Sequence, residues 1–301
     1  MCSDMSFRLN SADNYLEQAF SRNLGLINET EQQKLRESRI AIAGLGGVGG
    51  VHLLTLTRTG IGKFHIADLD SYEIGNVNRQ VSARVSTLNR QKVDVMVEDA
   101  LAINPYLEIK TFPQGITKEN IDTFLEGVSV VVDGLDFFEF DIRRLLFNRA
   151  REKGIYVVTA GPVGFGVVSF VFSPVGGMTF DEYFDVKETM SVLDKTVKFL
   201  LGIAPNTDYW KYYDFSKVSG RRKSAPSLGL ACQLCSGVAA TEVVKILLKR
   251  GRIKPAPHYF QFDPYLQRYF TGYLFWGNRN PLQRLKMHLA RKMLTRPMGE
   301  R

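Results

Sequence analysis

The stretch Arg39-Ile40-Ala41-Ile42-Ala43-Gly44-Leu45-Gly46-Gly47-Val48-Gly49 decides the fold that we predict for this chain. The apolar run Arg39 to Ala43 predicts a buried strand, and the pattern of Val51 to Thr59 predicts a helix after the glycines. Glycines let the backbone come close to a phosphate, while the N-terminus of the next helix offers free N–H groups to an anion. The stretch therefore predicts a strand, a nucleotide-binding loop and a helix.

Strand-like and helix-like segments alternate after this unit. Further strands are predicted over Phe64 to Leu69, Leu107 to Phe112, Val128 to Asp133 and Ile155 to Thr159, and helices over Gln91 to Ile103, Ile121 to Glu126 and Asp141 to Lys153. Continuously apolar strands are typical of strands that are buried on both faces. The sequence thus predicts an α/β fold of the Rossmann-like type, a doubly wound and mostly parallel sheet with helices on both faces.

The regular alternation ends after Ala160. A glycine-rich turn, Gly161 to Gly166, and a strand, Val167 to Phe172, precede a polar and aromatic crossover excursion over residues 173–228. A connection of that length is typical of a lid or a binding segment. The last predicted elements of the domain are a helix over Gly237 to Arg250 and two closing antiparallel strands, His258 to Asp263 and Gln267 to Phe275.

The composition excludes several classes of protein. The chain has 301 residues, of which 45% are hydrophobic, and this suffices for a large buried core. Its longest apolar runs, such as Val128 to Val132 and Val167 to Val171, are strand-sized, so no transmembrane segment is predicted. Three cysteines are too few for a disulfide scaffold, and the first residues lack the pattern of a secretory signal. We therefore expect a cytoplasmic protein.

Positive charge gathers at the C-terminal end of the chain. The net charge is +8, and residues 277–301 hold seven Lys or Arg residues against the single Glu300. Leucines recur at helical spacing after Pro281, so a basic amphipathic helix is predicted there. This helix could pack on its own domain, or it could bind an acidic partner, RNA or an anionic membrane. We divide the chain into an N-terminal helical arm (1–35), the α/β domain (36–277) and this tail (278–301).

Four charged residues beyond the glycine loop indicate what kind of nucleotide binds. Asp68 ends the second predicted strand, where a carboxylate can accept hydrogen bonds from ribose hydroxyls. The loop and Asp68 fit a dinucleotide-binding dehydrogenase equally well, but Arg79 and Lys92 supply charge that a triphosphate needs. Asp136 follows a strand at the edge where the carboxyl ends of parallel strands gather, so it can hold magnesium. Alternatively, Asp136 caps the helix that begins at Asp141.

These motifs together resemble the ThiF/MoeB/HesA superfamily, which includes the adenylation domains of ubiquitin-activating enzymes. The similarity extends over residues 15 to 275. The segments that carry it are Phe20-Ser21-Arg22-Asn23, Gly44 to Gly49, Asp68-x-Asp70, Asn76-x-x-Arg79-Gln80, Lys92 and Asp133-x-x-Asp136. Their joint spacing is much more specific than the glycine loop alone. The resemblance implies that residues 36–277 form a ThiF-type adenylation domain.

The resemblance also implies a reaction and its cofactors, ATP and magnesium. A substrate carboxylate attacks the α-phosphorus of ATP and yields an acyl-adenylate and pyrophosphate; the carboxylate is already ionised, so no general base is needed. Asp68 is implied to bind the ribose, Asp136 the magnesium, and Arg22 the site of the partner subunit in a homodimer. The residues implied to contact ATP are Gly44, Gly46, Gly47, Gly49, Asp68, Asp70, Asn76, Arg79 and Lys92, and the catalytic ones are Arg22, Arg79, Lys92 and Asp136.

A first expectation about variants follows from these roles. Single cations such as Arg79 and Lys92 are usually solvated surface residues. Surface changes rarely alter stability by more than about 0.5 kcal/mol. Arg79→Ala and Lys92→Ala are therefore expected to leave the fold intact and to lower adenylation steeply.

The chain departs from the family pattern at its cysteines. Many members carry two Cys-x-x-Cys pairs around a structural zinc, whereas only Cys232-Gln233-Leu234-Cys235 occurs here, so no structural zinc is expected. Residues 137–231 contain no cysteine, which argues against a thioester step on the enzyme. Cys232 and Cys235 are either small buried residues before the helix at Gly237 or a redox or acceptor pair. Phe137 stands where many members have asparagine, and this change affects the nucleotide pocket.

Three functions remain open from the sequence. The first is activation of the C-terminal carboxylate of a ubiquitin-like or sulfur-carrier protein or of a peptide. The second, also by adenylation, is dehydration of threonylcarbamoyladenosine in tRNA, because Arg58 to Gly62 and Asn76 to Gln80 resemble that subfamily and the basic tail could serve tRNA. The third is a nucleotide-binding or NAD-binding module without adenylation.

Overall fold

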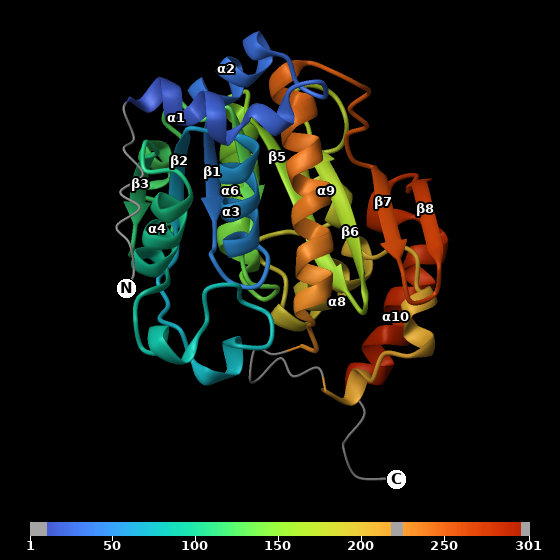
Figure 1. Ribbon diagram of the computed structural model, residues 1–301. Coiled ribbons are helices and arrows are strands. Elements are labelled where there is room, and N and C mark those ends of the chain that lie inside the picture. The colour runs from blue at the N-terminus through green and yellow to red at the C-terminus, as the bar shows by residue number, and fades with distance from the viewer. Residues whose placement is uncertain (1–10, 218–224, 296–301) are drawn as a thin grey trace.

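An eight-stranded sheet forms the centre of the computed structural model, which describes residues 11–217 and 225–295 (Figure 1). The strands are β1 (Arg39–Ala43), β2 (Lys63–Ala67), β3 (Glu108–Phe112), β4 (Val130–Asp133), β5 (Tyr156–Val163), β6 (Gly166–Phe172), β7 (His258–Asp263) and β8 (Arg268–Tyr273). Their order in the sheet is β3-β2-β1-β4-β5-β6-β7-β8. The strands from β3 to β5 pair in parallel and those from β5 to β8 pair antiparallel. The prediction of a doubly wound, mostly parallel sheet is confirmed.

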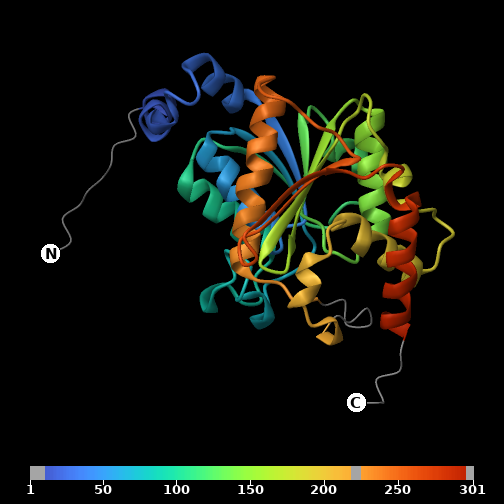
Figure 2. The same ribbon diagram turned by 90° about the vertical axis from the view of Figure 1, so that its right-hand side faces the viewer.

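Helices cover both faces of this sheet. They are α1 (Ala12–Ala19), α2 (Glu29–Glu37), α3 (Gly49–Thr59), α4 (Lys92–Ile103), α5 (Ile121–Phe124), α6 (Phe140–Glu152), α7 (Phe180–Phe184), α8 (Val192–Ile203), α9 (Gly229–Leu248) and α10 (Pro281–Thr295). Apolar side chains of α3, α4 and α9 share a core with one face of the sheet, and those of α5 to α8 share a core with the other. Figure 2 shows the sheet nearly edge-on between these two layers.

The loops after β1 and β4 come very close to each other. Strand β1 lies between β2 and β4, so the connections leave this point of the sheet in opposite directions. A Cβ added to Gly44 would lie 2.4 Å from the carbonyl oxygen of Gly134, and Gly44 has a φ of +83°. Only glycine allows both features. Open α/β sheets bind ligands at such a switch point.

Gly49→Ala should destabilise the protein, because the first residue of α3 leaves no room for a methyl group. A Cβ there would lie 1.8 Å from the carbonyl oxygen of Gly44. We expect a loss of about 2 kcal/mol in the free energy of unfolding, measured by urea titration. Gly237→Ala in α9 is the matched control, since nothing lies within 4 Å of its added Cβ. Alanine should stabilise that helix slightly, and equal effects at both positions would contradict the packing argument.

His52 of α3 makes the stability depend on pH. The side chain is 1% exposed and both of its ring nitrogens lack a hydrogen-bond partner among the described residues. Burial lowers the pKa of His52 from 6.5 to about 3. Between these values the unfolded chain binds a proton that the folded chain does not, so acid favours unfolding.

We therefore expect the free energy of unfolding to fall by about 2 kcal/mol more in the wild type than in His52→Leu between pH 7.5 and pH 5. Urea titrations at the two pH values measure this difference. The exposed His288 supplies the control, and His288→Gln should keep the wild-type dependence. An unchanged pH dependence in His52→Leu would show that other groups cause it.

Helix α9 begins earlier than the sequence predicts. The expected start at Gly237 is wrong, because the helix runs from Gly229 to Leu248. Cys232 and Cys235 therefore lie within the helix instead of preceding it. With 20 residues and a mean hydropathy of 1.5, α9 is long and apolar enough to cross a membrane by these two criteria. In the structure it packs between α3 and strands β5 and β6, as a core helix does.

The segment after Ala160 also differs from the prediction. The expected glycine-rich turn over residues 161–166 is wrong in its bounds, because β5 continues to Val163 and only Gly164 and Phe165 connect it to β6. The excursion over residues 173–228 is partly helical. Its helices α7 and α8 bring Phe180, Tyr183, Phe184 and Phe199 into the core on one face of the sheet. Hydrophobic burial thus orders a segment in which periodicity was weak.

Helix α2 near the start of the described chain and helix α10 at its end both pack on the α/β domain. In the N-terminal arm, Asn28 and Glu31 form a capping box that starts α2, and Leu35 of α2 is fully buried in the core. At the other end, α10 packs against α8, where Gln283 Nε2 donates to the carbonyl oxygen of Leu201. Of the alternatives left open for the basic helix, packing on its own domain is the one that the described part of α10 shows.

Candidate functional site

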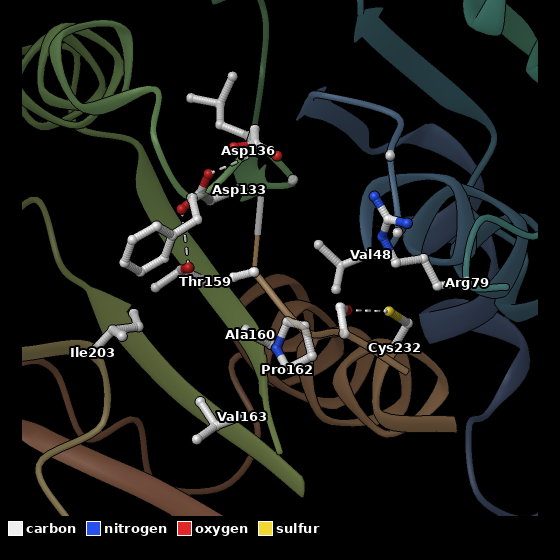
Figure 3. A pocket seen from close by; sticks show the side chains of 18 of the residues that line it. Val48, Arg79, Asp133, Asp136, Thr159, Ala160, Pro162, Val163, Ile203 and Cys232 are labelled. Atoms are coloured by element: carbon white, nitrogen blue, oxygen red, sulfur yellow. Dashed lines mark hydrogen bonds between the residues drawn. The ribbon is translucent and has the colours of Figure 1, made fainter. Parts of the chain in front are cut away.

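A cavity of about 260 Å³ opens at the carboxyl ends of β1, β4 and β5. Gly46 and Gly47 of the glycine loop line one side, and Asp133, Thr159 and residues of α8 line the other. Figure 3 shows Val48, Arg79 and Cys232 facing Asp133, Thr159 and Ile203 across this space. The cavity thus lies at the switch point that the fold predicts for a ligand.

Asp68 holds the glycine loop in place. Its Oδ2 accepts a hydrogen bond of 2.6 Å from the N–H of Leu45, and its Oδ1 accepts one of 2.8 Å from the N–H of Asp70. The residue is 8% exposed and is not among those that line the cavity. Burial raises the pKa of Asp68, while the charge of Lys92 and the two N–H donors counteract this. The ribose contact implied for Asp68 stays a prediction, since each carboxylate oxygen can accept a second hydrogen bond.

Lys92 is buried and paired with Asp70. The Lys92 side chain is 6% exposed, and its Nζ lies 2.9 Å from Oδ2 of Asp70, whose side chain is 57% exposed. Both residues line the cavity. The assumption that Lys92 faces solvent is therefore wrong, and Lys92→Ala removes packing as well as charge. The pair places a cation at the cavity wall with one acidic partner already in position.

Arg79 is the cation with the greatest freedom at the cavity. Its Nη1 donates to the carbonyl oxygen of Gly75 at 2.9 Å and to Oδ1 of Asn78 at 3.0 Å. The Arg79 side chain crosses above Gly47, where an added Cβ would lie 3.6 Å from Cγ of Arg79. No carboxylate pairs with Arg79 among the described residues. This guanidinium can therefore take an anion next to the loop backbone.

A buried ion pair that the sequence analysis missed supports the opposite wall. Nε of Arg143 lies 2.9 Å from Oδ2 of Asp133, and both side chains are 3% exposed. The same carboxylate oxygen accepts a hydrogen bond of 3.0 Å from the hydroxyl of Thr159. Nη2 of Arg143 donates to the carbonyl oxygens of Leu135 and Asp136 at 2.6 and 3.0 Å. Arg143 thus fixes the loop that carries Asp136.

Asp136 is an exposed residue at the rim of the cavity. Its Oδ1 accepts a hydrogen bond of 3.1 Å from the N–H of Phe138. The alternative role as a helix cap is wrong, because α6 begins at Phe140 after Glu139 and has no side-chain cap. Among the described residues, no three His, Cys, Asp or Glu side chains form a metal cluster. A single accessible carboxylate does fit magnesium that takes its other ligands from phosphates and water.

Three buried polar atoms at the cavity lack a hydrogen-bond partner in the described part of the chain. They are Oε1 of Gln80, Nη1 of Arg143 and the hydroxyl of Tyr209. These side chains are at most 6% exposed. Buried polar groups in proteins are nearly always paired, so a polar ligand in the cavity would satisfy them. These donors and acceptors fit a polar ligand better than an apolar one.

The crossover excursion supplies the apolar end of the cavity. Phe199 and Ile203 of α8, with Tyr209 and Tyr213, line this part. The guanidinium carbon of Arg143 lies 4.7 Å from the centroid of the Phe199 ring, a cation–π contact. The excursion therefore contributes directly to the pocket, which agrees with its expected role as a binding segment.

The two cysteines of α9 have different positions. Cys232 lines the cavity beneath Gly47, and Cys235 belongs to the hydrophobic core. Burial raises the pKa of the Cys232 thiol, although Ser227 and the charge of Arg79 counteract this. Burial also raises the pKa of the Cys235 thiol. Both thiols are fully buried, which favours the interpretation as small core residues over a redox pair.

Five residues of the predicted set do not line the cavity of their own chain, namely Gly44 and Gly49 of the loop, Asp68, Asn76 and Arg22. Asn76 forms a local turn in which its Oδ1 accepts a hydrogen bond from the N–H of Glu73. Arg22 lies beside Asn23, which donates to the carbonyl oxygen of Thr59 at the far end of α3. The 11 residues of α3 span about 16 Å and separate Arg22 from the loop at its N-terminus. A role of Arg22 in a partner subunit stays a prediction.

A family model now identifies this architecture. The model of the ThiF family matches residues 20–282. The chain belongs to the ThiF family. The match includes the glycine loop, the cavity and the excursion, and it ends within the first turn of α10.

Curated proteins of several activities are similar to this ThiF family member over part of its length. The tRNA threonylcarbamoyladenosine dehydratase of Bacillus subtilis (strain 168) is 36% identical over 142 residues, which cover 47% of this chain and 55% of that protein. The Escherichia coli enzyme of the same name is 30% identical, and the matched region covers 49% of this chain and 54% of that protein. The sulfur carrier protein ThiS adenylyltransferase of E. coli is 29% identical, and the matched region covers 48% of this chain and 56% of that protein. The chain thus spans little more than half the length of these relatives.

Solved structures share the fold over more of the chain. PaaA has a TM-score of 0.63 and 18% identity and covers 91% of this chain and 75% of its own. E. coli MccB with MccA-N7isoASN has a TM-score of 0.67 and 16% identity, and the match covers 90% of this chain and 76% of that one. E. coli TcdA, a tRNA N6-threonylcarbamoyladenosine dehydratase, has a TM-score of 0.57 and 22% identity. This match covers 79% of this chain and 96% of that one. At these identities the similarity shows the fold alone.

Proposed function

We propose that this chain activates a carboxylate with ATP and forms an acyl-adenylate. The observation that carries the proposal is the pair of cations, Arg79 and Lys92, on the wall of a cavity that also holds the glycine loop and Asp136. A triphosphate brings several negative charges, and the loop backbone with α3 behind it can accept phosphate oxygens. The two cations offset the charge that builds on the phosphates during transfer.

The chemistry requires mainly that two anions are held in line. The substrate carboxylate is ionised at neutral pH, so its oxygen attacks the α-phosphorus without a base, and pyrophosphate leaves. Arg79 can neutralise the phosphates, and Lys92 is kept in place by Asp70. Asp136 would hold magnesium, which would supply further positive charge to the phosphates. Positioning of the two reactants contributes the remaining rate enhancement.

The carboxylate that we favour is the threonine carboxylate of threonylcarbamoyladenosine in tRNA. Support comes from the B. subtilis and E. coli dehydratases, which are 36% and 30% identical over about half of this chain. In such a dehydration, a nucleophile of the same substrate attacks the carboxyl carbon and forms the new bond. Adenylation lets AMP leave from that carbon, whereas a free carboxylate has no comparable leaving group. The net charge of +8 is compatible with a polyanionic substrate.

A protein or peptide C-terminus is the second candidate. The ThiS adenylyltransferase of E. coli is 29% identical over 143 residues. The apolar end of the cavity beside Phe199 and Tyr213 suits a peptide tail as well as a modified nucleoside. In both cases the buried state of Cys232 argues that the adenylate is passed on without an enzyme thioester.

ATP–pyrophosphate exchange with the full chain tests these proposals. Four acceptors are compared: tRNA with threonylcarbamoyladenosine, the same tRNA without it, a ubiquitin-like protein that ends in Gly-Gly, and none. Exchange that needs the modified tRNA supports the dehydratase. Exchange that occurs only with the ubiquitin-like protein supports the second candidate. No exchange with any acceptor, together with tight NAD binding, would overturn adenylation in favour of a nucleotide-binding module.

Two further features belong to the proposal. Arg22 would complete the site of a second subunit, so a homodimer is proposed, and light scattering can measure its mass. A cytoplasmic location is proposed because the reaction uses ATP and both thiols of α9 are free.

A further inference from the structure

We propose that α10 attaches this enzyme to an anionic membrane surface. The contact is made by the outer stripe, which we define as Leu282, Leu285 and Leu289. These side chains are 71%, 57% and 46% exposed. Their spacing of three and four residues places them along one side of the helix. Three exposed leucines on one stripe form a larger apolar surface than scattered surface residues do.

The helix is already fixed to the domain by its other side. Gln283 is buried and donates to Leu201, and Ala290 is 5% exposed against Val197 and Leu201 of α8. Nζ of Lys286 donates to the carbonyl oxygen of Pro205 at 2.8 Å. The outer stripe therefore has no role in holding α10 to α8. Figure 2 shows α10, in red, along the margin of the molecule and away from the sheet.

The segment of the chain that contains the outer stripe carries charges of one sign. The sequence contains no Asp or Glu between Asp263 and Glu300, whereas the same stretch holds seven Lys or Arg residues. Arg284 is exposed on α10, and Arg291 reaches Asp194 of α8 at 3.0 Å. Each cation near an anionic membrane adds about a factor of five to binding. A stripe of leucines on a helix that also carries cations complements a bilayer with acidic headgroups.

Aromatic residues precede the helix. Phe275 and Trp276 are 63% and 65% exposed in the turn that leads into α10. Tryptophan and phenylalanine are favoured where apolar and polar layers of a membrane meet. RNA would engage the cations but would leave the leucines uncovered, and a second copy of α10 would bring like charges together. An anionic membrane can contact the leucines, the cations and the aromatic side chains at the same time.

Flotation of the full chain with vesicles tests the proposal. Vesicles of phosphatidylcholine with phosphatidylglycerol should carry the wild type to the top of a gradient, and pure phosphatidylcholine vesicles should not. The variant Leu282→Ser/Leu285→Ser/Leu289→Ser should bind at least about tenfold more weakly. Leu26→Ser is the matched control, because Leu26 is 80% exposed and lies in the N-terminal arm.

A charge variant keeps the test independent of the leucines. Arg284→Gln should weaken binding about fivefold, and Lys118→Gln, which removes an exposed cation elsewhere, should not. Failure of the wild type to float with the anionic vesicles would overturn the proposal. Vesicle binding by the triple leucine variant at the wild-type level would also overturn it. The same holds if the triple variant changes only the retention of tRNA or the mass measured by light scattering. None of these outcomes bears on pyrophosphate exchange in solution, which tests the proposed activity separately.

Discussion

Arg79→Ala should lower ATP–pyrophosphate exchange by about a thousandfold while the free energy of unfolding stays within about 0.5 kcal/mol of the wild type. Within residues 11–217 and 225–295, the guanidinium donates hydrogen bonds only to the carbonyl of Gly75 and the side chain of Asn78, which are both accessible to water. Its loss therefore leaves no buried group unpaired. In the proposed reaction it removes the most accessible cation at the phosphates, and the acyl substrate does not replace that charge.

The control for this prediction is Arg58→Ala. Arg58 is an exposed arginine near the end of α3 and does not line the cavity. It should retain wild-type exchange and stability. Arg79→Lys separates charge from geometry, because lysine keeps the charge but cannot form the planar two-donor contact. Wild-type exchange in Arg79→Ala would remove this residue from the site.

Arg143→Ala should destabilise the protein by about 3–5 kcal/mol, the largest stability effect that we expect. The substitution leaves the carboxylate of Asp133 buried with Thr159 and the N–H of Leu135 but without its ion-pair partner. It also releases the carbonyls of Leu135 and Asp136. Any folded enzyme that remains should have lower activity, because the loop that carries Asp136 loses its support. Thermal and urea unfolding measure the effect.

The neighbouring Arg144 offers a matched control on the same helix. Arg144 pairs with Asp181, and these side chains are 30% and 29% exposed. Partly solvated pairs contribute about 1 kcal/mol or less, so Arg144→Ala should be mild. The double variant Asp133→Leu/Arg143→Met should recover much of the lost stability, since two apolar side chains replace two buried charges. Equal losses in Arg143→Ala and Arg144→Ala would show that burial of the pair does not matter.

The contrast between Arg79 and Lys92 shows how far sequence reasoning reaches. Both were predicted as cations at a triphosphate site, and both line the cavity. Their environments differ completely, since Lys92 is 5% exposed and paired with Asp70. A sequence contains the charge of a side chain but not its burial. Lys92→Ala should therefore reduce both exchange and stability, and only Arg79→Ala isolates the chemistry.

Arg143 illustrates a second limit. It lies on a helix with many charged residues, where a single arginine looks like part of a solvated face. Only the position of α6 in the folded protein brings its guanidinium to Asp133 of β4 and Phe199 of α8. The excursion follows the same rule, because Tyr209 and Ile203 reach the cavity through contacts with residues distant in the chain. Contacts of this kind have no local signature.

The sequence by itself determined the parallel sheet, the glycine loop and the acidic and basic residues around it. These depend on local patterns: continuous apolar strands, glycines at a strand end and short spacings along one loop. The tertiary structure alone decided which charges are buried, where α9 begins and which side of α10 stays exposed. Burial and ion pairing depend on neighbours that are far apart in the chain, and only the folded core brings those neighbours together.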